Sequence, residues 1–169
     1  MKNKLIRGYT LVELIIAVGL FALIMTLASG AYLVMININR QTQSIATGVD
    51  NLSFALETMM RIIRTGTNYS CDNSGDCSGG TSFSVINTDG EEVNYVLSNG
   101  IITQNGIALT DPSVTVSSLV FYASGTGKPP ADYQQPRVTV VVSGTVSSGA
   151  GKTESFTIET GATMRGTDI

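Results

Sequence analysis

One acidic residue, Glu13, lies at the start of a long apolar stretch. No charged residue occurs from Leu14 to Asn39, where Leu, Ile, Val, Ala, Met and Phe predominate. A carboxylate near the start of an apolar membrane helix costs up to about 3 kcal/mol, and such groups usually face a partner rather than lipid. Alternatively, Glu13 lies at headgroup level near Arg7, where water reaches it. The chemistry that this position offers is ion pairing.

A second reactive group is formed by Cys71 and Cys77, the two cysteines of the chain. If this part of the chain lies outside the membrane, a disulfide is the default, and it would restrain a short loop. Between them, Asp72, Ser74 and Asp76 are spaced like the start of a calcium loop, but the distal Glu that such a loop needs is missing. We therefore predict a disulfide, no metal site and no cofactor.

Composition argues against catalysis and against nucleic-acid binding. The 169 residues include 10 Lys+Arg, 13 Asp+Glu and no His, giving a formal charge of −3. Without His, the usual general base and zinc ligand are missing. A nucleic-acid binder should be basic. The sequence also has no GxSxG elbow, Walker loop, HExxH motif or paired carboxylates. We expect neither an enzyme nor a nucleic-acid partner.

The N-terminal segment has the length and charge pattern of a membrane anchor. Residues 1–8 carry Lys2, Lys4 and Arg7, and the apolar stretch that follows exceeds the roughly 20 residues that span a bilayer. The basic leader should stay in the cytoplasm while the rest crosses the membrane. A secretory signal has an apolar core of about 7–15 residues, and the small residues 28–31 lie too deep for its cleavage site.

Residues 8–14, Gly-Tyr-Thr-Leu-Val-Glu-Leu, resemble the cleavage and methylation signature of type IV prepilins and type II secretion pseudopilins. In that family a short basic leader precedes Gly, an aromatic residue, Thr-Leu-(Ile/Val)-Glu and a long apolar helix. The resemblance implies cleavage after Gly8 by a membrane aspartyl prepilin peptidase and N-methylation of Tyr9. It also implies two further partners, other pilin or pseudopilin subunits and an inner-membrane assembly platform.

Cleavage would give Glu13 a partner. The new α-amine of Tyr9 has a reference pKa of about 7.7–8.0 and is largely a cation near neutrality. Glu13 of one subunit can meet this amine on a neighbour, because two costly buried charges then form a charge-assisted hydrogen bond. The pair would fix the axial register of bundled helices. Removal of Lys2, Lys4 and Arg7 takes the formal charge from −3 to −6.

Beyond Arg40 the sequence predicts an amphipathic helix that ends at Gly66. Its apolar stripe steps by four and three residues through Ile45, Val49, Leu52, Leu56, Met59 and Ile63. We expect this stripe to pack on the protein's own sheet, with a partner helix as the alternative. Asp50, Glu57, Arg61 and Arg64 fall away from it.

Residues 51–66 also look like the helix end of the minor pilin or J-type pseudopilin branch, and residues 137–142 and 156–163 look like its closing strands. At a helix C-terminus, Arg61 and Arg64 suit the macrodipole, and we prefer this role to a binding role.

From residue 82 the apolar period becomes two, which predicts strands at residues 82–87, 91–97, 101–104, 114–123, 137–146 and 153–163. Asp89-Gly90, Asn99-Gly100 and Asn105-Gly106 are hairpin signals, so we expect an antiparallel meander. Residues 124–136 form a Gly- and Pro-rich excursion, where Tyr133 is the residue to test for a contact.

Together these features predict an α+β chain with the type IV pilin-like fold, a long N-terminal helix packed on an antiparallel β-sheet. The expected parts are a cleaved leader (1–8), a transmembrane and assembly helix (9–39), an amphipathic half (40–66) and a globular β domain (67–169).

We expect a structural subunit, minor rather than major, held by one span in the inner membrane with its C-terminal domain outside. It would then enter an extracellular pilus or a periplasmic pseudopilus. The alternatives are a major pilin and a membrane-anchored ligand-binding module outside the cytoplasm.

Overall fold

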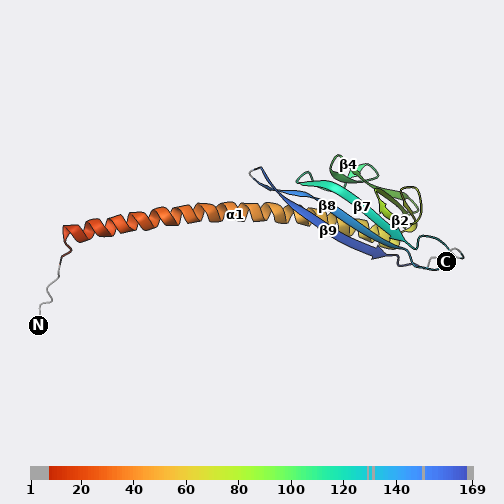
Figure 1. The fold of residues 1–169 in the computed structure, drawn as a ribbon, viewed down its shortest axis with the longest axis horizontal. Helices are drawn as coiled ribbons and strands as arrows, with labels where there is room; N and C mark the ends of the chain where they lie inside the picture. Colours follow the sequence, from red (N-terminus) through yellow and green to blue (C-terminus); the bar gives the residue numbers. More distant parts are fainter. Residues whose placement is uncertain (1–7, 129, 131, 150, 167–169) are drawn as a thin grey trace, which may run out of the picture. The chain divides into compact units, whose positions relative to one another are not determined.

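The computed structural model describes residues 8–128, 130, 132–149 and 151–166 (Figure 1). One long helix, α1 (Leu11–Thr65, 55 residues), precedes the strands. The strands are β1 (Thr67–Cys71), β2 (Cys77–Gly80), β3 (Ser82–Ile86), β4 (Glu92–Ser98), β5 (Ile101–Gln104), β6 (Ile107–Ala108), β7 (Val114–Ser124), β8 (Arg137–Gly149) and β9 (Lys152–Thr163). This is the α+β arrangement that the sequence predicted. The chain divides into two compact units, Met1–Gln41 and Thr42–Ile169.

In the second unit, one stripe of α1 is buried against the strands. Four residues of the predicted stripe are fully or almost fully buried: Leu52, Leu56, Met59 and Ile63. Val49 and Ile45, one and two turns before them, are only half-buried. The helix thus contributes to a core whose largest fully buried side chains include Tyr95, Phe83 and Phe121.

The helix ends at Thr65, next to the glycine that the sequence marked as its stop. Gly66 is not among the residues with positive φ, so the left-handed turn typical of a C-terminal glycine is not the reason. Instead, a Cβ on Gly66 would lie 2.4 Å from Cγ2 of Val85, so close packing requires glycine. The Tyr69 hydroxyl lies 2.6 Å from the carbonyl oxygen of Ile63, which satisfies one of the open acceptors at the helix end.

The strands form two antiparallel sheets, where the sequence predicted one. The first has the order β1-β3-β4-β5-β6, and the second has the order β2-β7-β8-β9. The break follows β6, where Asp111 accepts a hydrogen bond from the Ser113 amide at 2.8 Å and closes a turn around Pro112. Proline has no amide to donate to a ladder, so pairing stops there and starts anew at β7. The rings of Phe83 and Phe121 stack across the two sheets with centroids 5.4 Å apart.

Six strands lie where the alternating pattern placed them, with ends that differ by up to three residues. Sequence reasoning missed β1, β2 and β6. Both of the first two are rich in Asn, Ser or Gly, which are more typical of turns than of strands. They form strands because β3 and β7 supply their pairing partners.

Candidate functional site

The start of α1 is capped by a residue that sequence reasoning passed over. The Thr10 hydroxyl accepts a hydrogen bond from the backbone amide of Glu13 at 3.3 Å, and the Thr10 carbonyl accepts the first helical bond, from Leu14, at 3.2 Å. Thr10 is therefore the N-cap, and Glu13 occupies the third helical position. A Thr-x-x-Glu spacing is the signature of a capping box, so the signal was present in the sequence. Glu13 also lies in the first turn, where the helix dipole favours an acidic side chain.

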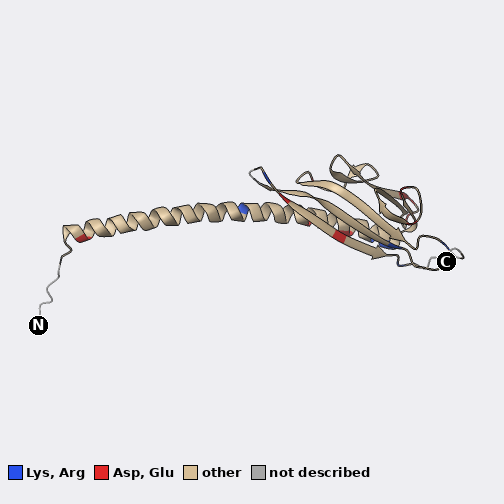
Figure 2. Ribbon diagram, viewed as in Figure 1, with Lys and Arg blue, Asp and Glu red and all other residues tan. Residues whose placement is uncertain are grey.

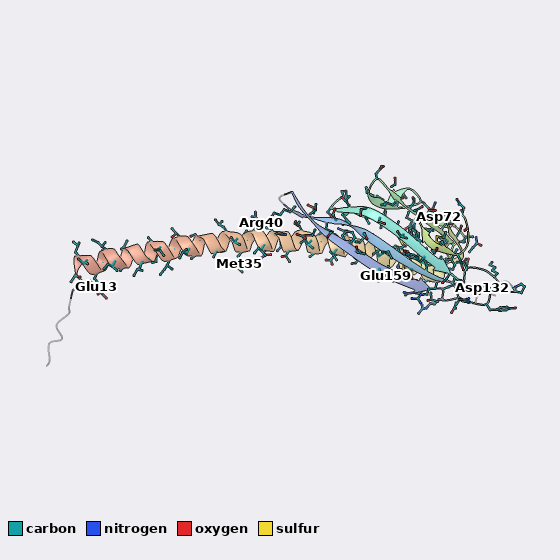
Figure 3. All side chains as sticks on the ribbon, in the orientation of Figure 1. Glu13, Met35, Arg40, Asp72, Asp132 and Glu159 are labelled. Atoms are coloured by element: carbon teal, nitrogen blue, oxygen red, sulfur yellow. A yellow bond between two sulfur atoms is a disulfide. The ribbon has the colours of Figure 1, made fainter. Side chains whose placement is uncertain are left out.

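Glu13 and Tyr9 are both exposed, and within the described residues no ion pair or side-chain hydrogen bond joins them. Tyr9 has 84% of its surface accessible. In Figure 3, Glu13 lies at the start of the helix, with apolar side chains projecting around the turns that follow. The basic residues Lys2, Lys4 and Arg7 lie outside the described residues. The Glu13 carboxylate is thus open to a group from another molecule.

The first half of α1 exposes apolar side chains around its whole circumference. Exposed large residues run from Leu11 to Ile38, and Phe21 and Leu27 have 60% and 67% of their surface accessible. Figure 2 shows this part of the helix almost without charged residues. An exposed apolar surface of this extent marks a membrane or protein contact, since water would penalise it. By length and composition α1 is suited to cross a membrane, with a mean hydropathy of 2.6 in its most apolar window.

Two hydroxyl side chains inside this apolar segment are satisfied by the helix itself. Thr26 donates to the carbonyl of Leu23 at 2.8 Å, and Ser29 donates to the carbonyl of Met25 at 2.8 Å. Hydrogen bonds to the preceding turn remove the need for water around these hydroxyls. Because polar groups in lipid must be satisfied internally, both residues suit a membrane environment.

Cys71 and Cys77 form a disulfide with a Cα–Cα distance of 6.0 Å. Cys71 ends β1 in the first sheet, and Cys77 begins β2 in the second, so the disulfide links the two sheets. Gly80 packs closely on the disulfide, because a Cβ there would come within 3.2 Å of both sulfur atoms. The disulfide therefore joins strands that neither hydrophobic pattern nor propensity would hold in place.

The acidic residues of the disulfide loop bind two different segments. Asp72 accepts hydrogen bonds from the backbone amides of Ser82, at 2.8 Å, and Thr81, at 3.1 Å. Asp76 accepts the Thr126 hydroxyl at 2.7 Å and the Thr126 amide at 2.9 Å. The Ser82 amide is the main cause of the lowered pKa of Asp72, and the Thr126 hydroxyl is the main cause of the lowered pKa of Asp76.

These contacts give the two carboxylates a structural role within the protein. In the part of the chain that the structure describes, no group of three or more His, Cys, Asp or Glu side chains lies together to hold a metal. Asp76 instead fixes the start of the excursion after β7. Further along that excursion, Tyr133 is 82% exposed.

Comparison with known proteins bears on the N-terminal segment. Residues 3–29 match the family model of the prokaryotic N-terminal methylation motif. No curated protein and no solved structure matches the chain. The matched motif identifies a type IV pilin-like prepilin leader, and it indicates a subunit of the pilin or pseudopilin type, which is a structural class. It also implies assembly with other pilin subunits and processing by a prepilin peptidase. With the apolar helix, it indicates anchoring in a membrane.

Proposed function

We propose that this chain is a structural subunit of a type IV pilus or a type II secretion pseudopilus, and a minor subunit within that class. The observation that carries the proposal is the exposed carboxylate of Glu13 at the start of the exposed apolar half of α1, within a prepilin-type leader motif. An apolar helix alone would anchor the chain. A charged group in the first turn of the helix is costly to place in a membrane, and pairing with an opposite charge on another subunit offsets that cost.

In this proposal the leader is cut between Gly8 and Tyr9, and the new amine of Tyr9 is methylated. The amine of one subunit then pairs with Glu13 of a neighbour. If one helix is shifted along its axis relative to its neighbour, both charges are left unpaired in a region of low dielectric. The ion pair therefore selects one axial register. The inner membrane holds the subunits, with the C-terminal domain outside, until the assembly platform adds them to a fibre.

The choice of a minor subunit depends on the likeness of residues 51–66 to the minor pilin and J-type branch. The abundance of the chain in purified filaments tests it directly. A minor subunit should be present at a small fraction of the main subunit, whereas the chain would be the dominant component if it were the major pilin.

Mass analysis of the N-terminus tests the processing step. Chain taken from filaments or from the membrane of a strain with a prepilin peptidase should begin at Tyr9 and carry one added methyl group. A strain lacking the peptidase should yield the chain with Met1 or its immediate successor at the N-terminus. An intact leader in assembled material, or a cut near Ala31, would remove the basis for the proposal.

Substitutions at Glu13 and Thr10 separate ion pairing from helix capping. Glu13→Gln keeps a side chain able to complete the capping box but removes the charge. Glu13→Ala removes both, and Thr10→Ala removes the cap alone. Because an uncompensated buried charge is costly, we expect both Glu13 variants to lower incorporation into filaments by at least about tenfold. Thr10→Ala should lower it by less than about fivefold, the effect of a lost cap. Incorporation of Glu13→Gln at the wild-type level would contradict the ion pair.

A further inference from the structure

The two sheets end in four edge strands, and three of them are short. β1 has five residues and β2 has four, each with an irregularity in its pairing, and β6 has two. The fourth edge strand, β9, has 12 residues and pairs with β8 alone, with a register shift only near the hairpin. It contains no proline, and its one lysine is its first residue. β9 therefore largely lacks the short length, bulges, proline and central lysines that protect an edge from pairing with another chain.

The hydrogen bonds next to β9 identify which of its backbone groups face the open edge. The Met164 amide donates to the Pro136 carbonyl at 2.9 Å, so Met164 pairs toward β8. Residues of an antiparallel strand alternate between pairing with one neighbour and facing the other side, and the register is continuous over residues 153–163. The Ser147 amide agrees with this alternation, because it donates to the Ser113 carbonyl on the opposite side of β8, at 3.1 Å. The N–H and C=O groups directed away from β8 therefore belong to Ser155, Thr157, Glu159, Gly161 and Thr163.

These five residues are exposed, and their outward backbone groups are open. Within the described residues, no backbone N–H or C=O group of the five takes part in a hydrogen bond on the outer side of β9. The inner face of the strand is also incomplete, because Phe156 and Ile158 pack on the core but are only partly buried. Free backbone groups beside partly covered apolar side chains are the setting in which an extended peptide adds a strand to a sheet.

The charge at the centre of this edge discriminates between partners. Glu159 is the middle residue of the five and the one charged residue from 155 to 163 (Figure 3). Two copies of β9 that paired antiparallel over the whole edge would place Glu159 opposite Glu159, because the two-fold axis would pass through the middle residue. Like charges directly opposite each other are destabilising. The edge thus disfavours its own copy and favours a strand with a basic residue at that position.

The exposed face of β9 also has room for a long side chain beside Glu159. A depression of about 320 Å³ lies over Gly161, which has no side chain to fill it, and Arg137, Thr139 and Glu159 are among the residues that line it. Within the described residues, the Glu159 carboxylate has no ion-pair partner. It is therefore open to a basic group from another chain.

We propose that β9 binds an extended segment of a different protein chain, which adds to the sheet as an antiparallel strand and places a basic side chain opposite Glu159. Alternate residues of this segment are apolar, because they lie next to Phe156 and Ile158 on the inner face. The residues between them are polar and share the exposed face with Glu159. The whole contact lies within the strand-containing unit and requires neither the leader nor Glu13, so it goes beyond the proposed function.

A synthetic peptide tests this edge on the full chain in detergent micelles. The probe is the fluorescently labelled peptide Thr-Val-Thr-Val-Lys-Val-Thr-Val-Thr, whose lysine is level with Glu159 when the peptide pairs antiparallel over residues 155–163. We expect saturable binding, measured by fluorescence polarisation. The same peptide with glutamate in place of lysine should bind at least about threefold more weakly, because it puts like charges opposite each other. In the Glu159→Lys variant this preference should reverse.

Methylation of peptide amides tests whether backbone pairing holds the contact. Methyl groups on the amides of the third and seventh peptide residues block N–H groups that would face β9, whereas methyl groups on the fourth and sixth block N–H groups that face away. The first form should bind at least about tenfold more weakly than the second, since it loses two hydrogen bonds to the edge. The two forms carry the same number of methyl groups, so equal binding of both would overturn the proposal.

Substitution of Thr157 tests the same contact from the side of the protein. Its amide faces the open edge, so Thr157→Pro removes a hydrogen bond to an added strand but none to β8. Thr157→Val is the matched control, because it keeps the amide and, like the proline variant, loses the hydroxyl that lies 3.0 Å from the Ser143 hydroxyl. We expect binding at least about fivefold weaker for Thr157→Pro and close to wild type for Thr157→Val. If Thr157→Pro fails to fold, the methylated peptides decide the question.

The outcomes are distinct from those that test the proposed function. Absence of saturable binding of the unmodified peptide below about 1 mM overturns the proposal and leaves assembly through Glu13 unaffected. Conversely, the peptide should bind Glu13→Gln as tightly as the wild-type chain. A loss of binding in that variant would contradict a contact confined to the strand-containing unit.

Discussion

The two halves of α1 are built from similar apolar residues, but they reach burial in different ways. In the second half, one stripe is covered by the protein's own strands, and Leu52, Met59 and Ile63 are fully buried. In the first half, large apolar residues are exposed around the helix from Leu11 to Ile38, and nothing in the described chain covers them. The two halves differ in their content of polar residues, which are frequent in the second half and rare in the first. One half therefore contributes to folding, whereas the other leaves its apolar surface available for a membrane or for another molecule.

The sharpest test of this contrast makes the same substitution in each half. Leu52 has none of its surface accessible, whereas Leu27 has 67% accessible. Leu52→Ala should lower the free energy of unfolding of the strand-containing unit by about 2–5 kcal/mol, because it removes buried methyl groups and leaves a cavity. Leu27→Ala should leave that free energy unchanged. Thermal unfolding of the full chain in detergent, followed by near-ultraviolet circular dichroism, measures both. A comparable loss of stability from Leu27→Ala would break the contrast.

The sequence predicts the parts of the molecule whose structure follows from local pattern. The four-and-three spacing around Leu52 and Leu56 predicts which face of the helix is buried, and the period of two locates six strands. The apolar run from Leu14 to Asn39 is evident from the sequence without reference to any other segment of the chain. In each case the signal repeats over several turns or strand positions, so single exceptions do not obscure it.

What the sequence does not predict depends on contacts between distant residues. β1 and β2 have turn-like compositions and owe their pairing to β3 and β7. The division into two sheets depends on where the chain stops pairing, at Pro112. Asp72 and Asp76 have spacing that resembles a calcium loop, yet their hydrogen bonds go to Ser82 and Thr126 in other segments. The Thr10 cap does have a local signal, because Glu13 follows it at the capping-box spacing.

Substitution of glycine by alanine in each half of α1 tests the same contrast, with a smaller expected effect on stability. A Cβ on Gly48 would lie 2.4 Å from Cγ1 of Val146, whereas a Cβ on Gly30 would meet nothing within 4 Å. Alanine gains about 1 kcal/mol of helix propensity over glycine at either site. At Gly48, overpacking costs about 1–3 kcal/mol and should outweigh that gain. We therefore expect a lower melting temperature of the strand-containing unit for Gly48→Ala and no decrease for Gly30→Ala.

A second substitution shows whether the effect at Gly48 arises from this contact. Val146→Ala removes the methyl group that the new Cβ would meet, so adding it to Gly48→Ala should cost less than Val146→Ala alone costs in the wild-type chain. Independent effects of the two substitutions would contradict the overpacking argument.

We expect low pH to lower the stability of the strand-containing unit. This effect should be smaller than those of the leucine and glycine substitutions. The carboxyl groups with lowered pKa in the described chain, Asp72, Asp76 and Asp111, all lie in that unit, and each owes the shift to hydrogen bonds. A carboxyl group whose pKa is lower when folded binds protons more readily in the unfolded chain. Its contribution is complete above the unfolded pKa of about 4 and is lost as pH falls through the folded pKa.

Stability should accordingly change little through these groups between neutral pH and about pH 4 and then decline. Asp76→Asn should reduce the slope of that decline, because the carboxylate that accepts the Thr126 hydroxyl is gone. Asp89→Asn, at a turn where no hydrogen bond to the carboxylate is formed among the described residues, should leave the slope unchanged. Melting temperatures of the full chain from pH 7 to pH 2 measure this. Identical slopes for both variants would mean that the Asp76 contact to the excursion after β7 adds nothing to folding. The link between the disulfide loop and that excursion would then depend on Cys71–Cys77 and the β2–β7 ladder alone.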